Sequence, residues 1–350
     1  MKQIHNFSAG PAILPQEVIQ NCSDALQNFS GTNLSLIEVS HRSKEFVNVM
    51  DEAQSLVKKL MNIGDDYEVM YLQGGASSQF LMVAMNLLEN KAAYLNTGTW
   101  STKAIKEAKH YGAINELASS ADKNFNYIPK DYTIGSDNDY FHCTSNNTIF
   151  GTQMQNFPDS PVPMICDMSS DIFSRKIDFS AFSLIYAGAQ KNMGPAGTTL
   201  VVVKKEILNQ VSRYIPTMLD YNTHINKGSM FNTPSVFAVY GCLQTLKWID
   251  GQGLEEIENY NNLKADLIYS EIDQNDMFEG TTAIEDRSIM NATFVLKEER
   301  LNDAFLNACN EANISGLKGH RSVGGFRASM YNAMRIESVK VLVDVMRNFK

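Results

Sequence analysis

The chain of 350 residues has the length of one large domain with a smaller partner domain. Hydrophobic residues make up 44% and charged residues 20%, which suffices for a sizeable core and excludes a disordered chain. The formal net charge of −9 argues against a nucleic-acid partner or an anionic membrane surface, because either needs a broad basic face. Small anionic substrates remain possible, since a binding site can be positively charged in a chain whose net charge is negative.

The cysteines indicate a reducing compartment. They are odd in number, widely scattered and without a CxxC pair, so we expect no structural zinc, no other metal site and no disulfide scaffold. The N-terminal segment 1–6 lacks the apolar core of a signal peptide, and no apolar run reaches the length of about 18 residues that a membrane span needs. The sequence therefore predicts a soluble cytoplasmic protein. The cysteines are Cys22, Cys143, Cys166, Cys242 and Cys309.

The first clear helical pattern lies in residues 46–60, where apolar side chains recur at helical spacing between charged ones. From residue 67 short apolar runs alternate with further helical patterns. Several runs are apolar throughout, as expected for strands that are covered on both faces. This predicts an α/β fold with a mostly parallel sheet and helices on both sides. The candidate strands are residues 67–72, 92–96, 140–144, 163–167, 182–187 and 198–204.

A helical pattern from Pro234 towards Trp248 precedes a change of character at residues 251–253. A long polar helix is predicted over about 254–273. A strand at 291–296, a helix near 300–312, an apolar stretch at 326–331 and a final helix to the last residue follow. This order of elements predicts a smaller α+β domain. The first fifteen residues, rich in Gly and Pro, could pack with either domain.

The segment Gln73-Gly74-Gly75-Ala76-Ser77-Ser78 follows a predicted strand and leads into a helix expected to open at Gln79. Glycines allow a ligand to approach the backbone closely, and the free N–H groups of a helix start attract an anion such as phosphate. The plainer interpretation is a tight turn. The segment matches neither GxGxxG nor a P-loop.

Asp167 ends one of the buried strands, at the edge where α/β sheets bind ligands. The alternative is an N-cap for a following helix.

Lys191 comes at the end of the next apolar strand, among small residues and before the turn Gly194-Pro195-Ala196-Gly197. Most lysines are solvated surface groups, but a partly buried one has a lowered pKa and can form a Schiff base.

Positive charge gathers at two places in this acidic chain. His41 and Arg42 are adjacent, and Lys318, His320, Arg321 and Arg327 fall within ten residues around a Gly-Gly pair. Arginine matches the geometry of carboxylate and phosphate groups, and glycines permit close approach. A solvated surface patch is the alternative, but two such clusters in turn-rich segments favour a dianionic ligand.

A glycine anion loop, an Asp and then a Lys on successive strands are the parts that hold pyridoxal phosphate. With these residues in place, the chain resembles the fold-type I, class V aminotransferases, in particular those that act on phosphoserine. The resemblance spans nearly the whole chain in the family's order. It rests on segments 6–12, 40–43, 73–76, 96–101, 146–151, 189–192, 231–234 and 320–334.

The resemblance implies a role for each matching residue. Lys191 would form the Schiff base, and Asp167 would pair with the pyridinium nitrogen. Trp100 would stack on the cofactor ring, and Thr148 would bind near its phenolic oxygen. The cofactor phosphate would be held by Ala76, Ser77 and Gln190, with Asn232 and Thr233 from the other subunit. The substrate's phosphate and carboxylate would be bound by His41, Arg42, His320, Arg321 and Arg327. Some relatives carry Arg where this chain has Ser77.

The implied protein is a cytoplasmic homodimer with shared active sites. Its large domain would span residues 16–255, and its small domain residues 1–15 and 256–350. The implied reaction is reversible transamination between O-phospho-L-serine and 2-oxoglutarate, giving 3-phosphohydroxypyruvate and L-glutamate in serine biosynthesis. A role in pyridoxine biosynthesis, on a phosphorylated hydroxythreonine, stays open.

Three other functions compete with this interpretation. A serine–pyruvate type aminotransferase of class V would need fewer cationic residues. A ligand-binding protein on a decayed enzyme fold would be expected to lose Lys191 early. A nicotinamide-dependent dehydrogenase is disfavoured because the chain lacks GxGxxG.

Overall fold

The computed structural model describes residues 3–350. Its centre is a seven-stranded sheet in the order β2-β10-β9-β8-β5-β3-β4. Strand β10 runs antiparallel to both of its neighbours, and the other pairs are parallel. The strands are β2 (Tyr67–Leu72), β3 (Lys91–Asn96), β4 (Ala113–Ser119), β5 (Phe141–Thr144), β8 (Met164–Asp167), β9 (Leu184–Gly188) and β10 (Thr199–Lys204).

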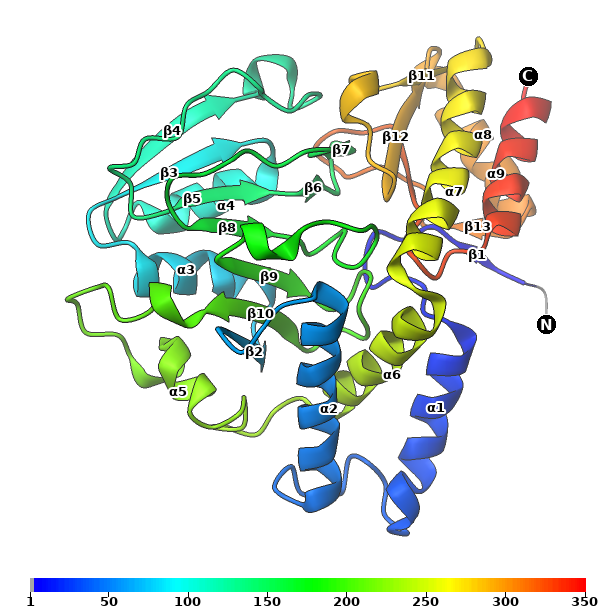
Figure 1. Ribbon diagram of the computed structural model, residues 1–350. Coiled ribbons are helices and arrows are strands. Elements are labelled where there is room, and N and C mark those ends of the chain that lie inside the picture. The colour runs from blue at the N-terminus through cyan, green and yellow to red at the C-terminus, as the bar shows by residue number, and fades with distance from the viewer. Residues whose placement is uncertain (1–2) are drawn as a thin grey trace.

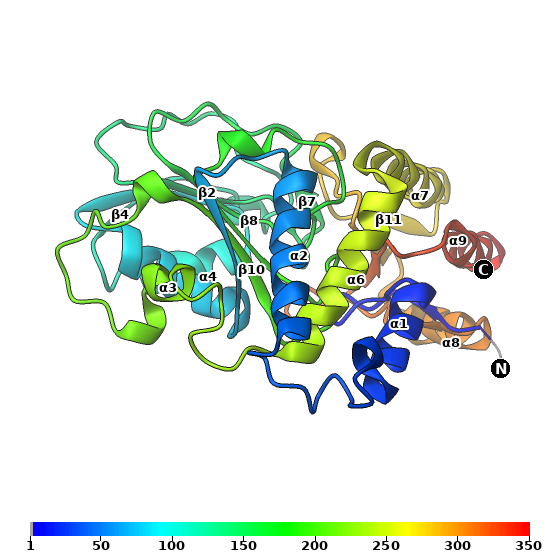
Figure 2. The ribbon, with the colours of Figure 1, turned by 60° about the horizontal axis from the view of Figure 1, so that its bottom comes forward.

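Helices cover both faces of this sheet, and two separate cores result. Helices α2 (Lys44–Met61) and α6 (Val236–Gln252) pack on one face, and α3 (Gly75–Leu87) and α4 (Thr99–Ala108) on the other (Figures 1 and 2). Alternate strand residues point to opposite faces. Leu200 of β10 therefore lies in the first core and Val201 in the second.

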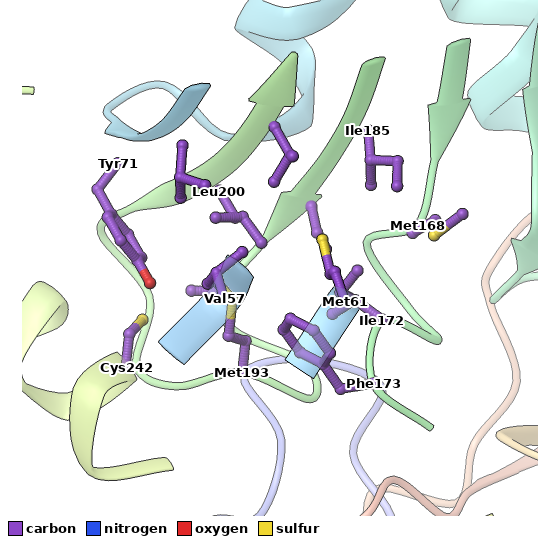
Figure 3. Close-up of a cluster of buried hydrophobic side chains, with 14 of the residues drawn as sticks. Val57, Met61, Tyr71, Met168, Ile172, Phe173, Ile185, Met193, Leu200 and Cys242 are labelled. Carbon is purple, nitrogen blue, oxygen red and sulfur yellow. The ribbon is translucent and has the colours of Figure 1, made fainter. Parts of the chain in front are cut away.

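Figure 3 shows part of the first core. Val57 and Met61 of α2 share this core with Leu200 of β10 and Ile185 of β9. The labelled Met193, close to Lys191 in sequence, is also buried in this core. The turn that carries Lys191 is thus anchored by apolar packing. Such packing holds a side chain in one place more firmly than a solvated loop would.

The C-terminal part forms a second structural unit with its own core. Strands β11 (Phe278–Gly280), β12 (Asn291–Leu296) and β14 (Phe326–Ser329) form an antiparallel sheet. It packs with α7 (Leu254–Gln274), α8 (Asn302–Glu311) and α9 (Ile336–Asn348) around a third core of buried side chains. Edge-to-face contacts among Phe278, Phe294 and Phe305 form part of that core.

The N-terminal segment joins this second unit. Strand β1 (His5–Asn6) pairs in parallel with β13 (Ile314–Ser315), and Phe7 is buried in the third core. Helix α1 (Gln16–Gln27) then packs beside α6 (Figure 1). These contacts favour the division into residues 16–255 and residues 1–15 with 256–350, which stays a prediction.

The predicted α/β fold with its mostly parallel sheet is confirmed. All six candidate strands of the large sheet form within about two residues of the predicted bounds, an ordinary error for element ends. Strand β4 was not predicted, because it is an edge strand without a buried residue and its sequence lacks an apolar run. Helix α3 begins at Gly75 and not at Gln79, so Ala76 and Ser77 lie in its first turn.

The remaining short elements join these units. They are β6 (Asn146–Asn147), β7 (Thr152–Gln153), α5 (Tyr221–Ile225) and several 3₁₀ turns, among them η1 (Phe29–Gly31). Within residues 3–350, none of the helices combines the length and the apolar character that a membrane span requires.

Candidate active site

Lys191 lies in the turn after β9 and meets residues from two other elements. Its Nζ donates a hydrogen bond of 2.8 Å to Thr148 Oγ1, in the connection between β6 and β7. The same Nζ lies 5.8 Å from the ring centroid of Trp100, the second residue of α4. The structure thus brings these three predicted residues together at one end of the sheet.

The surroundings of Lys191 favour its neutral form. Burial of the amine lowers its pKa to about 8, and the charge of Arg327 acts in the same direction. The carboxylates of Asp167 and Asp171 oppose this shift. About a tenth of the amine is therefore unprotonated at pH 7, far more than for an ordinary lysine, and a nucleophile or a general base requires this neutral form.

Asp167 is the last residue of β8, and only 4% of its surface is exposed. Its Oδ1 accepts a hydrogen bond of 2.9 Å from the backbone N–H of Ser169. The capping interpretation thus holds for one of the two oxygens, although a turn and not a regular helix follows. Burial raises the pKa of the carboxyl group, while Ser169 and the charge of Lys191 oppose the rise. A cationic partner would stabilise its ionised form.

The start of α3 has the geometry of an anion site. Gly74 is the N-cap with φ of 98°, and a Cβ built there would lie 1.9 Å from Ser78 Oγ. Only glycine fits this turn. Ala76 is half-buried and Ser77 exposed in the first helical turn, where backbone N–H groups lack intrahelical partners. The half-buried Gln190, next to Lys191, accepts a hydrogen bond from Ala12 N through its carbonyl oxygen.

The second structural unit contributes the cations. Arg327 on β14 is half-buried, and its Nη1 donates to the carbonyl oxygen of Thr148 at 3.4 Å. Its Nε is buried without a partner among the described residues. The pKa of His320 is lowered by burial and by the charges of Arg327, Arg321 and Lys103. Each of these three cations is therefore close enough to His320 to act on its charge.

Lys103 was missed by the sequence analysis. It follows Trp100 by one helical turn on α4, and its Nζ lies 4.7 Å from the indole centroid. The signal that could have found it is the spacing of three residues from an aromatic side chain on a predicted helix. Lys103 adds a positive charge beside the ring that faces Lys191.

Two predicted pairs are not brought to Lys191 within the chain. His41 and Arg42 lie in the connection from η1 to α2, at the bottom of Figure 1, far from β6 and β7. Arg42 is exposed, and His41 Nε2 is buried without a partner among residues 3–350. Asn232 and Thr233 lie beside the start of α3 instead. Gln73 accepts from Asn232 Nδ2 at 3.0 Å and donates to the carbonyl oxygen of Thr233 at 3.4 Å.

The donor set fits pyridoxal phosphate. Lys191 offers an amine for the aldehyde, and the buried Asp167 a carboxylate for a pyridinium N–H. Trp100 offers an aromatic face, and its buried Nε1 has no partner among the described residues. A buried donor left unpaired costs about 1–3 kcal/mol, so unpaired groups converging on one place indicate a ligand. The first turn of α3 suits the phosphate.

Comparison with known proteins gives consistent results. The sequence profile of the family Aminotransferase class-V matches residues 4–342. The phosphoserine aminotransferase of Flavobacterium psychrophilum is 59% identical over 350 residues, which cover 99% of this chain and 98% of that protein. The solved structure of phosphoserine aminotransferase from Bacillus circulans subsp. alkalophilus superimposes with a TM-score of 0.97 at 43% identity, over 100% of this chain and 99% of the other. That of PLP-bound phosphoserine aminotransferase from Trichomonas vaginalis gives 0.94 at 37% identity, over 99% and 100%.

Proposed function

The chain belongs to the class V aminotransferases, in the phosphoserine aminotransferase family, and we propose that it transfers the amino group of O-phospho-L-serine to 2-oxoglutarate. The products would be 3-phosphohydroxypyruvate and L-glutamate, and the reaction would be reversible. One observation carries this proposal: a lysine with a lowered pKa (Lys191), a buried carboxylate (Asp167) and the cations near His320 belong to one site. The first two suit the amine chemistry, and the cations suit a phosphorylated substrate.

Pyridoxal phosphate, which the family implies, would supply an electron-accepting ring that makes the α-hydrogen of a bound amino acid acidic. Asp167 would hold its ring nitrogen and Trp100 would stack on its ring. Thr148 would bind near its phenolic oxygen. Its phosphate would be held by Ala76, Ser77 and Gln190, together with the partner subunit's Asn232 and the partner subunit's Thr233.

Lys191 would move the proton that the reaction shifts. Because its pKa is lowered, the neutral amine could accept the proton from the substrate α-carbon as a general base. The ammonium group that results could then donate this proton as a general acid. Thr148 Oγ1, at 2.8 Å, orients Nζ. The negative charge of Asp167 would keep the ring nitrogen of the cofactor protonated. Because this carboxylate is buried, its interaction with the ring nitrogen would be stronger than in water.

The substrate's phosphate and carboxylate would be bound by His320, Arg321 and Arg327. Lys103 adds a positive charge near His320, beside those of Arg321 and Arg327. The connection from η1 to α2, which carries His41 and Arg42, lies far from β6 and β7 (Figure 1), so these two residues would not act on the same substrate. They would act on the active site of the partner in a homodimer. The family resemblance implies the same for Asn232 and Thr233, which lie beside α3 of their own chain. A dimer with shared sites therefore accounts for all of the predicted binding residues.

Two alternative functions would require a different chemistry from the proposed one. A serine–pyruvate type enzyme would not need the cations that gather around His320. A non-catalytic binding protein would not need an amine with a lowered pKa beside a buried carboxylate. We place the enzyme in the cytoplasm and propose neither a nucleic-acid nor a membrane partner, because its charge is −9.

The direct test is product analysis. The purified enzyme, supplied with pyridoxal phosphate, is incubated with phosphoserine and 2-oxoglutarate, and mass spectrometry follows glutamate and the phosphorylated keto acid. We expect both to form in equal amounts. A parallel reaction with 4-phosphohydroxy-L-threonine decides whether the enzyme also serves pyridoxine synthesis. Absence of glutamate in the first reaction would refute the proposed function.

A further inference from the structure

Lys264 of α7 is buried completely, with 0% of its surface exposed. Its Nζ donates to the carbonyl oxygens of Met330 at 3.1 Å and Tyr331 at 2.8 Å. The ammonium also lies 5.2 Å from the ring centroid of Tyr260, one turn earlier on the helix. Burial lowers its pKa to about 7. The groups around Nζ are thus two main-chain carbonyls and an aromatic face.

A lysine at this place is costly. Burying an ammonium group is unfavourable, and an apolar side chain of similar volume is often as stable or more stable. The apolar alternative would, however, lose both hydrogen bonds to the main chain. The benefit of Lys264 therefore lies in fixing the segment 330–331 and not in general stability.

That segment connects two parts of the candidate active site. It continues directly from β14, which carries Arg327. The hydroxyl of Tyr331 donates to the carbonyl oxygen of Ala9 at 2.8 Å. Ala9 precedes Gly10, where an added Cβ would lie 3.6 Å from Lys191 Cγ. The N-terminal segment at Ala9 and Gly10 is thereby held against the side chain of Lys191.

The next residue, Asn332, contacts the neighbour of Lys191 in the sequence. Asn332 N donates to Asn192 Oδ1 at 3.0 Å, and Asn192 directly follows Lys191. Asn261, three residues before Lys264 and on the same face of α7, donates to Asn332 Oδ1 at 2.9 Å and to the carbonyl oxygen of Ser174 at 2.8 Å. Two buried side chains of α7 thus hold three consecutive residues.

From these contacts we infer that Lys264 is a positioning residue, which holds the 330–332 segment so that Arg327 on one side and Lys191 on the other keep their relative places. This inference rests on the proposed function, because it concerns the same site. Lys264 is not among the residues proposed to bind the substrate. It acts through the main chain of Met330 and Tyr331, with Asn261 as its second contact.

The test compares Lys264→Met with Ile268→Val, a change at an equally buried residue of α7 in the third core. Methionine keeps the length of lysine but neither its charge nor its donors. For Lys264→Met we expect kcat/KM for phosphoserine to fall between about tenfold and a hundredfold, since a misplacement of about 1 Å can cost a hundredfold. We expect its Tm to stay within a few degrees of the wild type. Ile268→Val should lower Tm modestly and leave kcat/KM unchanged.

A second measurement separates positioning from stability without relying on activity. Hydrogen exchange of the peptide covering 326–334 should quicken in Lys264→Met, while the peptide covering 262–272 of α7 stays protected. A purely structural role would quicken both peptides, lower Tm and leave the folded enzyme fully active. Asn261→Leu should give the same pattern more weakly, and it decides the matter if Lys264→Met does not fold.

The inference is overturned if the folded variants keep wild-type kcat/KM and wild-type exchange in 326–334. Failure of the proposed function is a separate outcome, because it would appear as a wild-type enzyme that does not transaminate phosphoserine. In that case the exchange measurement still tests whether Lys264 holds the segment.

Discussion

Lys191 Nζ and Thr148 Oγ1 are joined by a hydrogen bond of 2.8 Å, although the two residues lie 43 positions apart. The carbonyl oxygen of the same threonine accepts from Arg327 Nη1 at 3.4 Å. Thr148 therefore links the large sheet, which carries Lys191, to the second unit, which carries Arg327. The electrostatic state of the lysine depends on both units.

The pH dependence of Lys191 follows from this arrangement. Only the neutral amine reacts with an electrophile, so labelling of Lys191 in the cofactor-free enzyme should rise with pH, with its inflection near pH 8. Arg327→Met removes a charge that lowers the pKa, and should move the inflection to higher pH. The measurement is reductive methylation with formaldehyde at a series of pH values, followed by peptide mapping. An inflection near the ordinary value of 10.5 would contradict it.

Asp167→Asn should keep the shape of the pocket and remove the charge. One pKa unit corresponds to about 1.4 kcal/mol, and a desolvated charge pair supplies several units. We expect kcat to fall at least about a hundredfold, with only a modest loss of bound cofactor. Cofactor absorbance and steady-state rates measure the two effects. Near-normal turnover would mean that the carboxylate serves only to cap the turn at Ser169.

Arg321→Ala should weaken phosphoserine specifically. Hydrogen bonds to charged groups contribute about 1.5–3 kcal/mol, so kcat/KM should fall about ten- to a hundredfold. Arg300→Ala is the matched control, because Arg300 is exposed and forms an ion pair with the nearby Glu298. Equal rates for the two variants would remove Arg321 from the substrate site.

Mixing two inactive variants tests whether Arg42 acts across a dimer. In a mixed dimer of Lys191→Ala with Arg42→Ala, one of the two sites keeps both residues if Arg42 comes from the partner. Random exchange of subunits makes half of the dimers mixed, so about a quarter of the wild-type activity should return. If Arg42 acted within its own chain, no site would hold both residues and the mixture would stay inactive. Sedimentation of each variant confirms that dimers form.

The sequence predicted the central sheet because its strands are covered on both faces and are therefore continuously apolar. It did not predict β4, because this edge strand has no buried residue and its sequence lacks a continuous apolar run. Of the candidate site, Lys191 and Asp167 were predicted from their places after buried strands, and Trp100 and Thr148 from the family resemblance. The structure brings Lys191 to Thr148 and Trp100. Lys103 was missed, because its role arises from proximity to His320, which folding alone creates.

The positions of His41 and Arg42 mark another limit. Their clustered charge suggested an anion site, but the connection from η1 to α2 that carries them lies far from β6 and β7 (Figure 1). A sequence pattern indicates which side chains suit a ligand and does not tell which copy of the chain supplies them. The same holds for Lys264, which in sequence is an ordinary lysine of a polar helix and in the fold is fully buried.

The most direct test of the proposed function compares kcat/KM for phosphoserine with kcat/KM for serine and alanine in the wild-type enzyme. Cations gather around the candidate site in a chain of net charge −9, and like charges repel unless an anionic ligand compensates them. Each charge-assisted hydrogen bond to the phosphate contributes about 1.5–3 kcal/mol, so two of them predict a preference of at least about a hundredfold for phosphoserine. Equal efficiency with serine or alanine would contradict the phosphate site and favour the serine–pyruvate type activity instead.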